Sequence, residues 1–127
     1  MRGTLLALAL LVACGGPALQ AVKLTNGTPR AISEVYVYPL GVASHGASRG
    51  SLAPNATLLV QVPGGNVEVE AISAVIELEN HQRERRHASS ALELTGPAEV
   101  VFFDQGAKPA LPPRAIGVEF VPGPVAP

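Results

Sequence analysis

The chain of 127 residues contains one cysteine, no tryptophan and few other aromatic residues, three Phe and two Tyr. A single cysteine excludes an intrachain disulfide and a metal cluster built from several thiolates. The scarcity of aromatic side chains removes the anchors that dominate most protein interfaces. Charge of one sign is also lacking, since nine Lys and Arg face ten Asp and Glu and the net charge is -1. Nucleic-acid binding is therefore disfavoured, because no excess of positive charge is available for the phosphates.

Long apolar runs are absent as well. No run reaches the roughly 18 to 20 apolar residues that a membrane-spanning helix needs. Residues 5–13 are an unbroken apolar run of nine residues, which as a helix extends only about 14 Å, against roughly 30 Å for a hydrocarbon core. With Arg2 before it, this run is typical of a secretion signal. The whole composition, 47% hydrophobic and 15% charged, fits one small globular domain.

The apolar run ends in Leu11, Val12 and Ala13, directly before the single cysteine, Cys14. This tetrapeptide resembles the lipobox of bacterial lipoproteins, which places small residues before the cleaved bond and a reactive thiol after it. The resemblance covers the leader alone. It implies that residues 1–13 are a signal peptide cut off before Cys14, and that fatty acyl chains such as palmitate on Cys14 hold the mature chain in a membrane. Two or three such chains, at about 0.8 kcal/mol per buried methylene, give stable attachment.

Residues 14–20 are then interpreted as the acylated cysteine and a short tether. In lipoproteins of bacteria with two membranes, an Asp directly after the cysteine often retains the protein at the inner membrane. Here that residue is Gly15, so the resemblance implies the outer membrane, facing the periplasm or the cell surface. Two alternatives stay open: ordinary signal-peptidase cleavage near Ala18, or secretion from a eukaryotic cell with glycans on Asn26 and Asn55.

The segments after the tether alternate apolar and polar residues with the period of a half-buried strand. In the first segment, Val22 and Leu24 alternate with polar residues, and the dipeptide of Asn26 and Gly27 predicts a turn because both residues tolerate positive φ. Residues 32–38 predict a second strand. Val35 and Val37 are expected on one face, and Glu34, Tyr36 and Tyr38 on the other.

Residues 58–71 predict the clearest hairpin. Its turn lies at residues 63–66, Val60 and Val69 are among the residues expected to face the core, and Glu68 and Glu70 are expected to point to water. Residues 91–95 and 100–103 predict two more strands, the second covered on both faces. Residues 73–88 are ambiguous, because their apolar residues fit helical spacing as well as strand alternation. We favour strand there, since no cap or proline separates this segment from the strand before it.

Together these segments predict an all-β fold: a small antiparallel β-sandwich of about seven to eight strands over residues 21–104. Residues 26–39 and 50–73 also resemble, weakly, the small β-sandwich domains of bacterial envelope lipoproteins. That likeness implies a fold type and carries no activity. Residues 105–127 contain six prolines and predict an extended tail, in which residues 116–120 alternate enough for one edge strand.

Arg83, Arg85 and Arg86 form the densest group of cations in the chain. Arginine binds phosphate and carboxylate groups through paired hydrogen bonds, so this segment is a candidate contact for an anionic envelope component or an acidic partner. The competing interpretation is a solvated loop. His81 and His87 flank the group, yet their spacing matches no closed zinc motif, and we expect no metal.

Residues 39–56 predict a long loop, and loops of this length are often functional. The loop contains Ser44, His45 and Ser48, which raises the possibility of a small serine hydrolase. The chain has a single Asp, Asp104, and no nucleophile elbow, so a flexible loop is favoured. No nucleotide or flavin fingerprint is present, and we expect neither a cofactor nor a small-molecule substrate.

Three functions follow, in order of preference. The first is a membrane-anchored envelope lipoprotein with a non-enzymatic structural or adaptor role and an envelope protein as partner. The second is a binding module for an anionic component through the arginine segment. The third is a small serine hydrolase.

Overall fold

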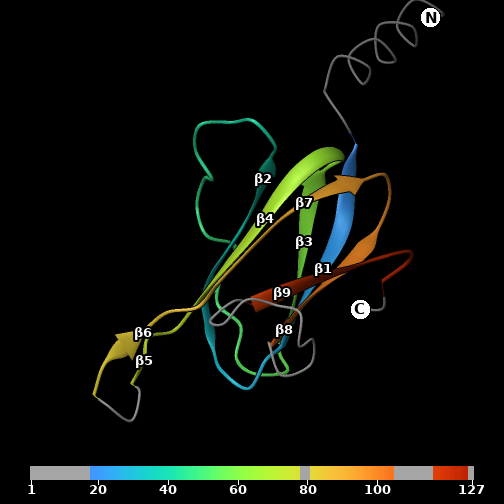
Figure 1. The fold of residues 1–127 in the computed structure, drawn as a ribbon. Helices are drawn as coiled ribbons and strands as arrows, with labels where there is room; N and C mark the ends of the chain where they lie inside the picture. The colour runs from blue at the N-terminus through green and yellow to red at the C-terminus, as the bar shows by residue number, and fades with distance from the viewer. Residues whose placement is uncertain (1–17, 78–80, 105–115, 126–127) are drawn as a thin grey trace, which may run out of the picture.

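The computed structural model describes residues 18–77, 81–104 and 116–125. Within these ranges the chain forms β-strands and no helix (Figure 1). Cys14 and the rest of the leader lie outside the described residues. The strands are β1 (Leu19–Gly27), β2 (Ile32–Pro39), β3 (Thr57–Pro63), β4 (Gly65–Ser73), β5 (Ile76–Glu77), β6 (Arg83–Glu84), β7 (His87–Leu94), β8 (Ala98–Asp104) and β9 (Ile116–Pro122).

Seven of these strands form the two sheets of a β-sandwich, which confirms the predicted all-β class. One sheet has the order β3-β1-β8-β9 and the other the order β2-β4-β7, while β5 and β6 form a separate two-stranded ribbon. Successive strands β1 and β2 belong to different sheets, so the chain crosses the sandwich after its first strand. The hairpin predicted over residues 58–71 is wrong: the two strands and the turn between them are present as β3 and β4, but β3 pairs with β1 while β4 pairs with β2 and β7 in the other sheet.

The parallel pairing of β1 with β8 differs from the fully antiparallel sandwich that the sequence predicts. Val22 is opposite Ala98 and Gly27 is opposite Phe103, with both strands running in the same direction. Alternation along a strand shows which residues are buried, but it carries no information on the direction of the neighbour. The two strands are separated by the entire β2-β4-β7 sheet in sequence, which supplies the long connection that parallel pairing requires.

The core lies between the two sheets and is almost wholly aliphatic. Alternate residues of each strand point into it, as the strand period predicts. Val60 packs against this core but is only partly buried, whereas Val62 and Val69 are fully enclosed. The buried cluster consists of Val22, Leu24, Ile32, Val35, Val37, Leu52, Val62, Val67, Val69, Ala71, Ala88, Leu94, Ala98, Val100, Phe102 and Ile116.

Asn26 is fully buried and fixes the crossing between the sheets. Its Nδ2 donates to the carbonyl oxygens of Arg30 at 2.8 Å and Leu52 at 3.1 Å. Its Oδ1 accepts from the amide and the hydroxyl of Thr28, at 3.0 and 2.7 Å. Both Nδ2 hydrogens are used and the side chain has no exposed area, so the folded domain has no room for a glycan at Asn26. The predicted glycan alternative at this residue is therefore incompatible with the fold.

Gly27 is required by close packing and not by its backbone angle. The residues with positive φ in the described ranges do not include Asn26 or Gly27, which corrects the expectation of a positive-φ turn. A β-carbon on Gly27 would lie 2.8 Å from the carbonyl oxygen of Phe102 on β8. Glycine lets the two parallel backbones approach at this point.

The described residues between β4 and β7 leave the sandwich as an arm, here defined as residues 74–77 and 81–86 (Figure 1). β5 and β6 pair within it, so the strand-and-loop interpretation is confirmed and the helix alternative is wrong for the described part. Ser73 ties the base of the arm, because its amide donates to the carbonyl of Arg86 at 2.9 Å and its hydroxyl accepts from the Arg86 amide at 2.8 Å.

The edge strand predicted near the C-terminus is present as β9, which pairs with β8. Phe103 lies directly opposite Gly117, and a β-carbon on Gly117 would fall 2.1 Å from the Phe103 ring. The phenyl ring thus covers the glycine, a cross-strand pairing known to support glycine at sheet edges. None of the described residues belongs to a helix that is long and apolar enough to cross a membrane.

Candidate functional site

The outer surface of the β2-β4-β7 sheet is the most distinctive part of the described molecule. Strand alternation sends Val67 and Val69 inward and therefore turns Glu68 and Glu70 outward, as the sequence predicts. Register then places Tyr38 opposite Glu68, and Tyr36 opposite Glu70. We call this surface the acidic face, and it comprises Glu34, Tyr36 and Tyr38 of β2, Glu68 and Glu70 of β4, and Ser89 and Glu93 of β7.

Hydroxyl groups hold three of the four carboxylates of the acidic face in place, those of Glu34, Glu68 and Glu70. Tyr38 donates to Glu70 Oε1 at 2.9 Å, and Tyr36 donates to Glu34. Ser89 on β7 donates to Glu68 across the strand pair. Both tyrosines of the chain therefore lie on this face, each bonded to a glutamate.

The negative charges shift the ionisation of both tyrosines in one direction. Burial, the hydrogen bond to Glu70 and the charges of Glu70 and Glu68 raise the pKa of Tyr38 to about 12. The hydrogen bond to Glu34 is the main cause that raises the pKa of Tyr36, with burial second. Each phenol must stay protonated to donate its bond, so the face keeps its hydroxyl donors throughout the physiological pH range.

The long loop after β2 folds back along the free edge of that strand. The Arg49 amide donates to the carbonyl of Val35 at 2.7 Å, and the Val35 amide donates to Ser48 Oγ at 3.3 Å. Arg49 Nη2 adds a bond to the carbonyl of Val37 at 3.1 Å. These contacts satisfy the backbone groups that an edge strand would otherwise expose.

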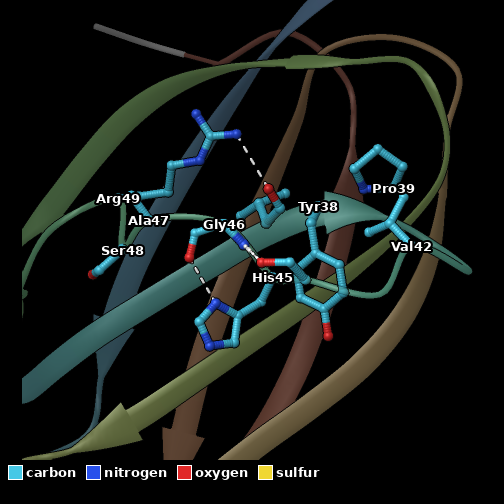
Figure 2. A pocket seen from close by; sticks show the side chains of 10 residues that line it. Tyr38, Pro39, Val42, His45, Gly46, Ala47, Ser48 and Arg49 are labelled. Atoms are coloured by element: carbon cyan, nitrogen blue, oxygen red, sulfur yellow. Dashed lines mark hydrogen bonds between the residues drawn. The ribbon is translucent and has the colours of Figure 1, made fainter.

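The same loop and β2 enclose an open cavity of about 530 Å³ (Figure 2). His45 lies on the Tyr36 ring with ring centroids 3.8 Å apart, and 6.3 Å from the Tyr38 ring. The loop thereby adds a third ring to the acidic face. The cavity is lined by Val37, Tyr38, Pro39, Val42, Ser44, His45, Gly46, Ala47, Ser48 and Arg49.

The loop residues that suggest a serine hydrolase are engaged with their own backbone. His45 Nδ1 lies 2.7 Å from the carbonyl oxygen of Gly46, and Ser44 Oγ accepts from the Gly46 amide at 3.2 Å (Figure 2). Ser48 Oγ donates to the carbonyl of Gly50 at 3.3 Å. These bonds are those of a polar turn, in which each side chain bonds a neighbouring peptide group.

The structure places the three arginines, which lie within four positions of the sequence, in different surroundings. Arg83 lies exposed on β6. Arg85 is about half exposed, with Nη1 3.8 Å from Glu34 Oε2 on the acidic face. Arg86 is 19% exposed and bonds Glu84 Oε1 at 2.9 Å and Asp104 Oδ1 at 3.0 Å. The solvated-loop interpretation is therefore wrong for Arg86, because its side chain is mostly buried and bonds Asp104 at the end of β8.

Asp104 forms ion pairs with two arginines, Arg86 and Arg30. It accepts from Arg86, and Arg30 Nη2 lies 3.4 Å from its other oxygen. Two guanidinium groups thus converge on one carboxylate at the end of β8.

Of the two histidines that flank the arginines in the sequence, His81 has an acidic neighbour. Its Nδ1 lies 3.2 Å from Glu77 Oε1, and both side chains are exposed. Across the described ranges, no group of three or more His, Cys, Asp or Glu is placed to hold a metal ion.

Comparison with known proteins finds a similar fold and indicates no activity. No protein-family model matches the chain, and no curated protein matches it significantly. A solved structure described as the NMR structure of a protein from Eubacterium rectale is similar, with a TM-score of 0.51 over 86% of this chain and 94% of that one. Sequence identity is 11%, so the likeness concerns the fold alone. The chain is a small all-β domain whose structural neighbour has no function in its description.

Sequence reasoning missed the acidic face as a unit. The outward positions of Glu34, Tyr36 and Tyr38 are predictable from alternation, and so are those of Glu68 and Glu70. Their meeting depends on the pairing of β2 with β4, which are separated by the long loop and β3. The near absence of cations from these strands is the signal that would have drawn attention to them.

Proposed function

We propose that the protein is a membrane-anchored envelope lipoprotein with a non-enzymatic structural or adaptor role. The observation that carries this proposal is the position of Cys14, directly after the tripeptide of Leu11, Val12 and Ala13 that ends a nine-residue apolar run. The folded domain starts at β1, whose first residue is Leu19. A few residues thus separate the proposed acyl anchor from the sandwich, which suits a module displayed close to a membrane.

An adaptor role is supported by how the described side chains are used. Ser44, His45 and Ser48 bond the backbone of their own loop, and three of the four carboxylates of the acidic face are held by hydroxyl donors. Such a surface presents fixed groups to a partner. We infer an envelope protein as that partner and the outer membrane as the location, because Gly15 follows Cys14 in place of a retaining Asp.

The anion-binding alternative retains support from two of its three arginines. Arg83 is exposed and Arg85 is about half exposed, so both are accessible to phosphate or carboxylate groups. Arg86 already bonds two carboxylates and contributes to the fold. This alternative therefore rests on two accessible cations on the arm, and it ranks second.

The anchor is tested in a bacterium with two membranes by comparing the wild type with Cys14→Ser and Gly15→Ser. Mass spectrometry of the mature N-terminus should find acyl groups on Cys14 in the wild type and in Gly15→Ser. Cys14→Ser should lose both the acyl groups and the cleavage before residue 14. An unmodified wild-type N-terminus near Ala18 would refute the lipoprotein proposal.

The non-enzymatic role has its own test. A serine-reactive phosphonate probe is incubated with the purified chain and with Ser44→Ala and Ser48→Ala. We expect no specific labelling, because neither hydroxyl is bonded to His45. Labelling that one of these variants abolishes would favour the hydrolase alternative.

A further inference from the structure

The acidic face has a charge pattern that the whole chain lacks. β2, β4 and β7 contain no Lys or Arg, and their charged side chains are Glu34, Glu68, Glu70 and Glu93. All four point outward, because Val35, Val69 and Leu94 at inward positions are buried. A chain with a net charge of -1 therefore concentrates negative charge on one side of one sheet. Such a surface attracts cations and repels the anionic headgroups of a membrane.

Aromatic and apolar groups lie beside these carboxylates. The Tyr38 ring is partly exposed on the same face, whereas Tyr36 is 6% exposed with the His45 ring lying on it, and an accessible ring face attracts a Lys or Arg side chain. The adjacent cavity is lined in part by Val42, which is 47% exposed, and Leu40, nearby in the chain, is 51% exposed. The aliphatic stem of a long cationic side chain can pack against such groups while its charged end meets a carboxylate.

One cation of the chain already occupies an end of this surface. Arg85 reaches back from the arm and places Nη1 3.8 Å from Glu34 Oε2. Its long separation and half-exposed side chain describe a loose ion pair. The contact shows that a guanidinium group can approach the acidic face. The carboxylates of Glu68, Glu70 and Glu93 lie further along the face, where hydroxyl donors come from Tyr38 and Ser89.

We propose that the acidic face docks a basic, extended polypeptide segment of a partner protein, with its Lys or Arg side chains on the four glutamates and the Tyr38 ring. The occupant is chosen by charge complementarity: several cations on one backbone match several carboxylates at fixed positions. The inference deepens the proposed adaptor role, on which it rests for its biological setting, by naming the chemistry of the partner.

The experiment measures binding of a synthetic peptide of alternating Lys and Ser to the purified full chain in detergent. The chain has no tryptophan and its two tyrosines lie on the acidic face, so tyrosine fluorescence reports from the proposed site itself. We expect a saturable fluorescence change that weakens as salt is added, because salt screens exposed charges. A peptide of alternating Glu and Ser should produce no change. Equal binding of both peptides would overturn the inference.

Two matched triple variants locate the binding. Glu68→Gln/Glu70→Gln/Glu93→Gln removes three charges from the face and should weaken the Lys peptide roughly tenfold, since each exposed pair contributes modestly. Glu77→Gln/Glu99→Gln/Glu119→Gln removes the same charge elsewhere and should bind like the wild type. Equal affinities for the two triple variants would overturn the inference.

Arg85→Gln supplies a variant whose expected effect is a gain and therefore does not resemble misfolding. It removes the intrachain competitor from Glu34 and should tighten the Lys peptide about twofold to threefold. Weaker binding by Arg85→Gln would count against the proposed surface. The proposed anchor and the proposed docking surface can be refuted independently. The peptide assay does not depend on acylation, and the mass measurement on Cys14 does not depend on the peptide.

Discussion

The acidic face and the arm carry charge in opposite ways. On the arm, Arg83, Arg85 and Arg86 are within four positions of one another, yet the fold sends them to solvent, to Glu34 and to Asp104. On the acidic face, four glutamates spread over residues 34–93 meet on one side of one sheet. The arginines that are close together in the sequence therefore lie apart in the fold, and the glutamates that are far apart in the sequence lie on one face.

The difference follows from strand geometry. Of the three arginines on the arm only Arg83 lies in a strand, so no regular alternation places their side chains on one face. Residues at alternate positions share a face, and the register of β2 with β4 and of β4 with β7 aligns three such rows. On the sheet, strand register brings charged side chains of different strands together. On the arm, the position of each charged side chain is set by its own partner.

The largest effect is expected from moving a carboxylate from the outer to the inner side of β4. Val69→Asp introduces a carboxylate at a side chain that is 1% exposed, between the outward residues Glu68 and Glu70. An unpaired charge in this core costs several kcal/mol, comparable with the roughly 5 to 15 kcal/mol that hold a domain together. The variant should be unfolded by circular dichroism at room temperature.

Two controls calibrate that result. Leu59→Asp, at a side chain that is 50% exposed, should melt close to the wild type. Val60→Asp, at a partly buried side chain, should fall between the two. Cooperative melting of Val69→Asp near the wild-type temperature would show that β4 does not have the orientation described.

A smaller loss is expected at the root of the arm. Arg86→Gln removes the cation shared by Glu84 and Asp104, and it should lower the free energy of unfolding by about 1 to 3 kcal/mol, because those carboxylates lose a charged partner in a half-buried setting. Arg83→Gln should change it by less than about 0.5 kcal/mol, as is usual for an exposed residue. Denaturant titration compares the two. Equal losses would mean that the arm behaves as one solvated loop.

The pH dependence of the acidic face has a definite sign. The pKa of Tyr38 is raised from 10 in the unfolded chain to about 12 in the folded one. Above pH 10 the unfolded state loses this proton first, so the stabilisation present at lower pH should disappear as pH rises from 10 to about 12. Tyrosinate absorbance should show late titration of Tyr38. Glu70→Gln should lower the pKa and Glu93→Gln should leave it, and the reverse result would contradict the hydrogen-bond assignment.

The smallest effect concerns the ion pair that joins the two regions. A double-mutant cycle of Arg85→Gln and Glu34→Gln should give a coupling of about 0.2 to 0.5 kcal/mol, since the pair is loose and exposed. Thermal melting of the four proteins measures it. A coupling above about 1 kcal/mol would mean that the arm is fastened to the acidic face.

Much of the fold is readable from alternation. Val22 and Leu24, Val35 and Val37, and the inward residues of β4 are buried as their spacing predicts. The order of the strands is not readable, and the parallel pairing of β1 with β8 has no counterpart in the pattern of either strand. Pairing is decided by the packing of the whole chain, to which no single segment gives access.

The candidate site was predictable in its parts and not as a whole. Sequence density drew attention to the arginines, and Arg86 proved to be structural because its partner Asp104 lies 18 positions later, at the end of β8. The same density argument passed over Glu34 and Glu93, which are single charges in apolar strands. The loop at residues 39–56 is long, as expected, and its contribution is to cover the edge of β2 and place His45 on Tyr36.

The position of β1 within its sheet bears on how the protein would carry mechanical load. Residues 22–25 of β1 are paired on both sides, antiparallel to β3 and parallel to β8. A tension applied through the N-terminus, as an acyl anchor at Cys14 would apply it, enters at an inner strand and pulls along its axis. The hydrogen bonds on both flanks then resist together in shear, whereas an edge strand such as β9 would peel away bond by bond. Resistance to such a pull is set by the rate of unfolding, so under the proposed anchoring and docking the domain would gain kinetic durability from starting in the middle of a sheet.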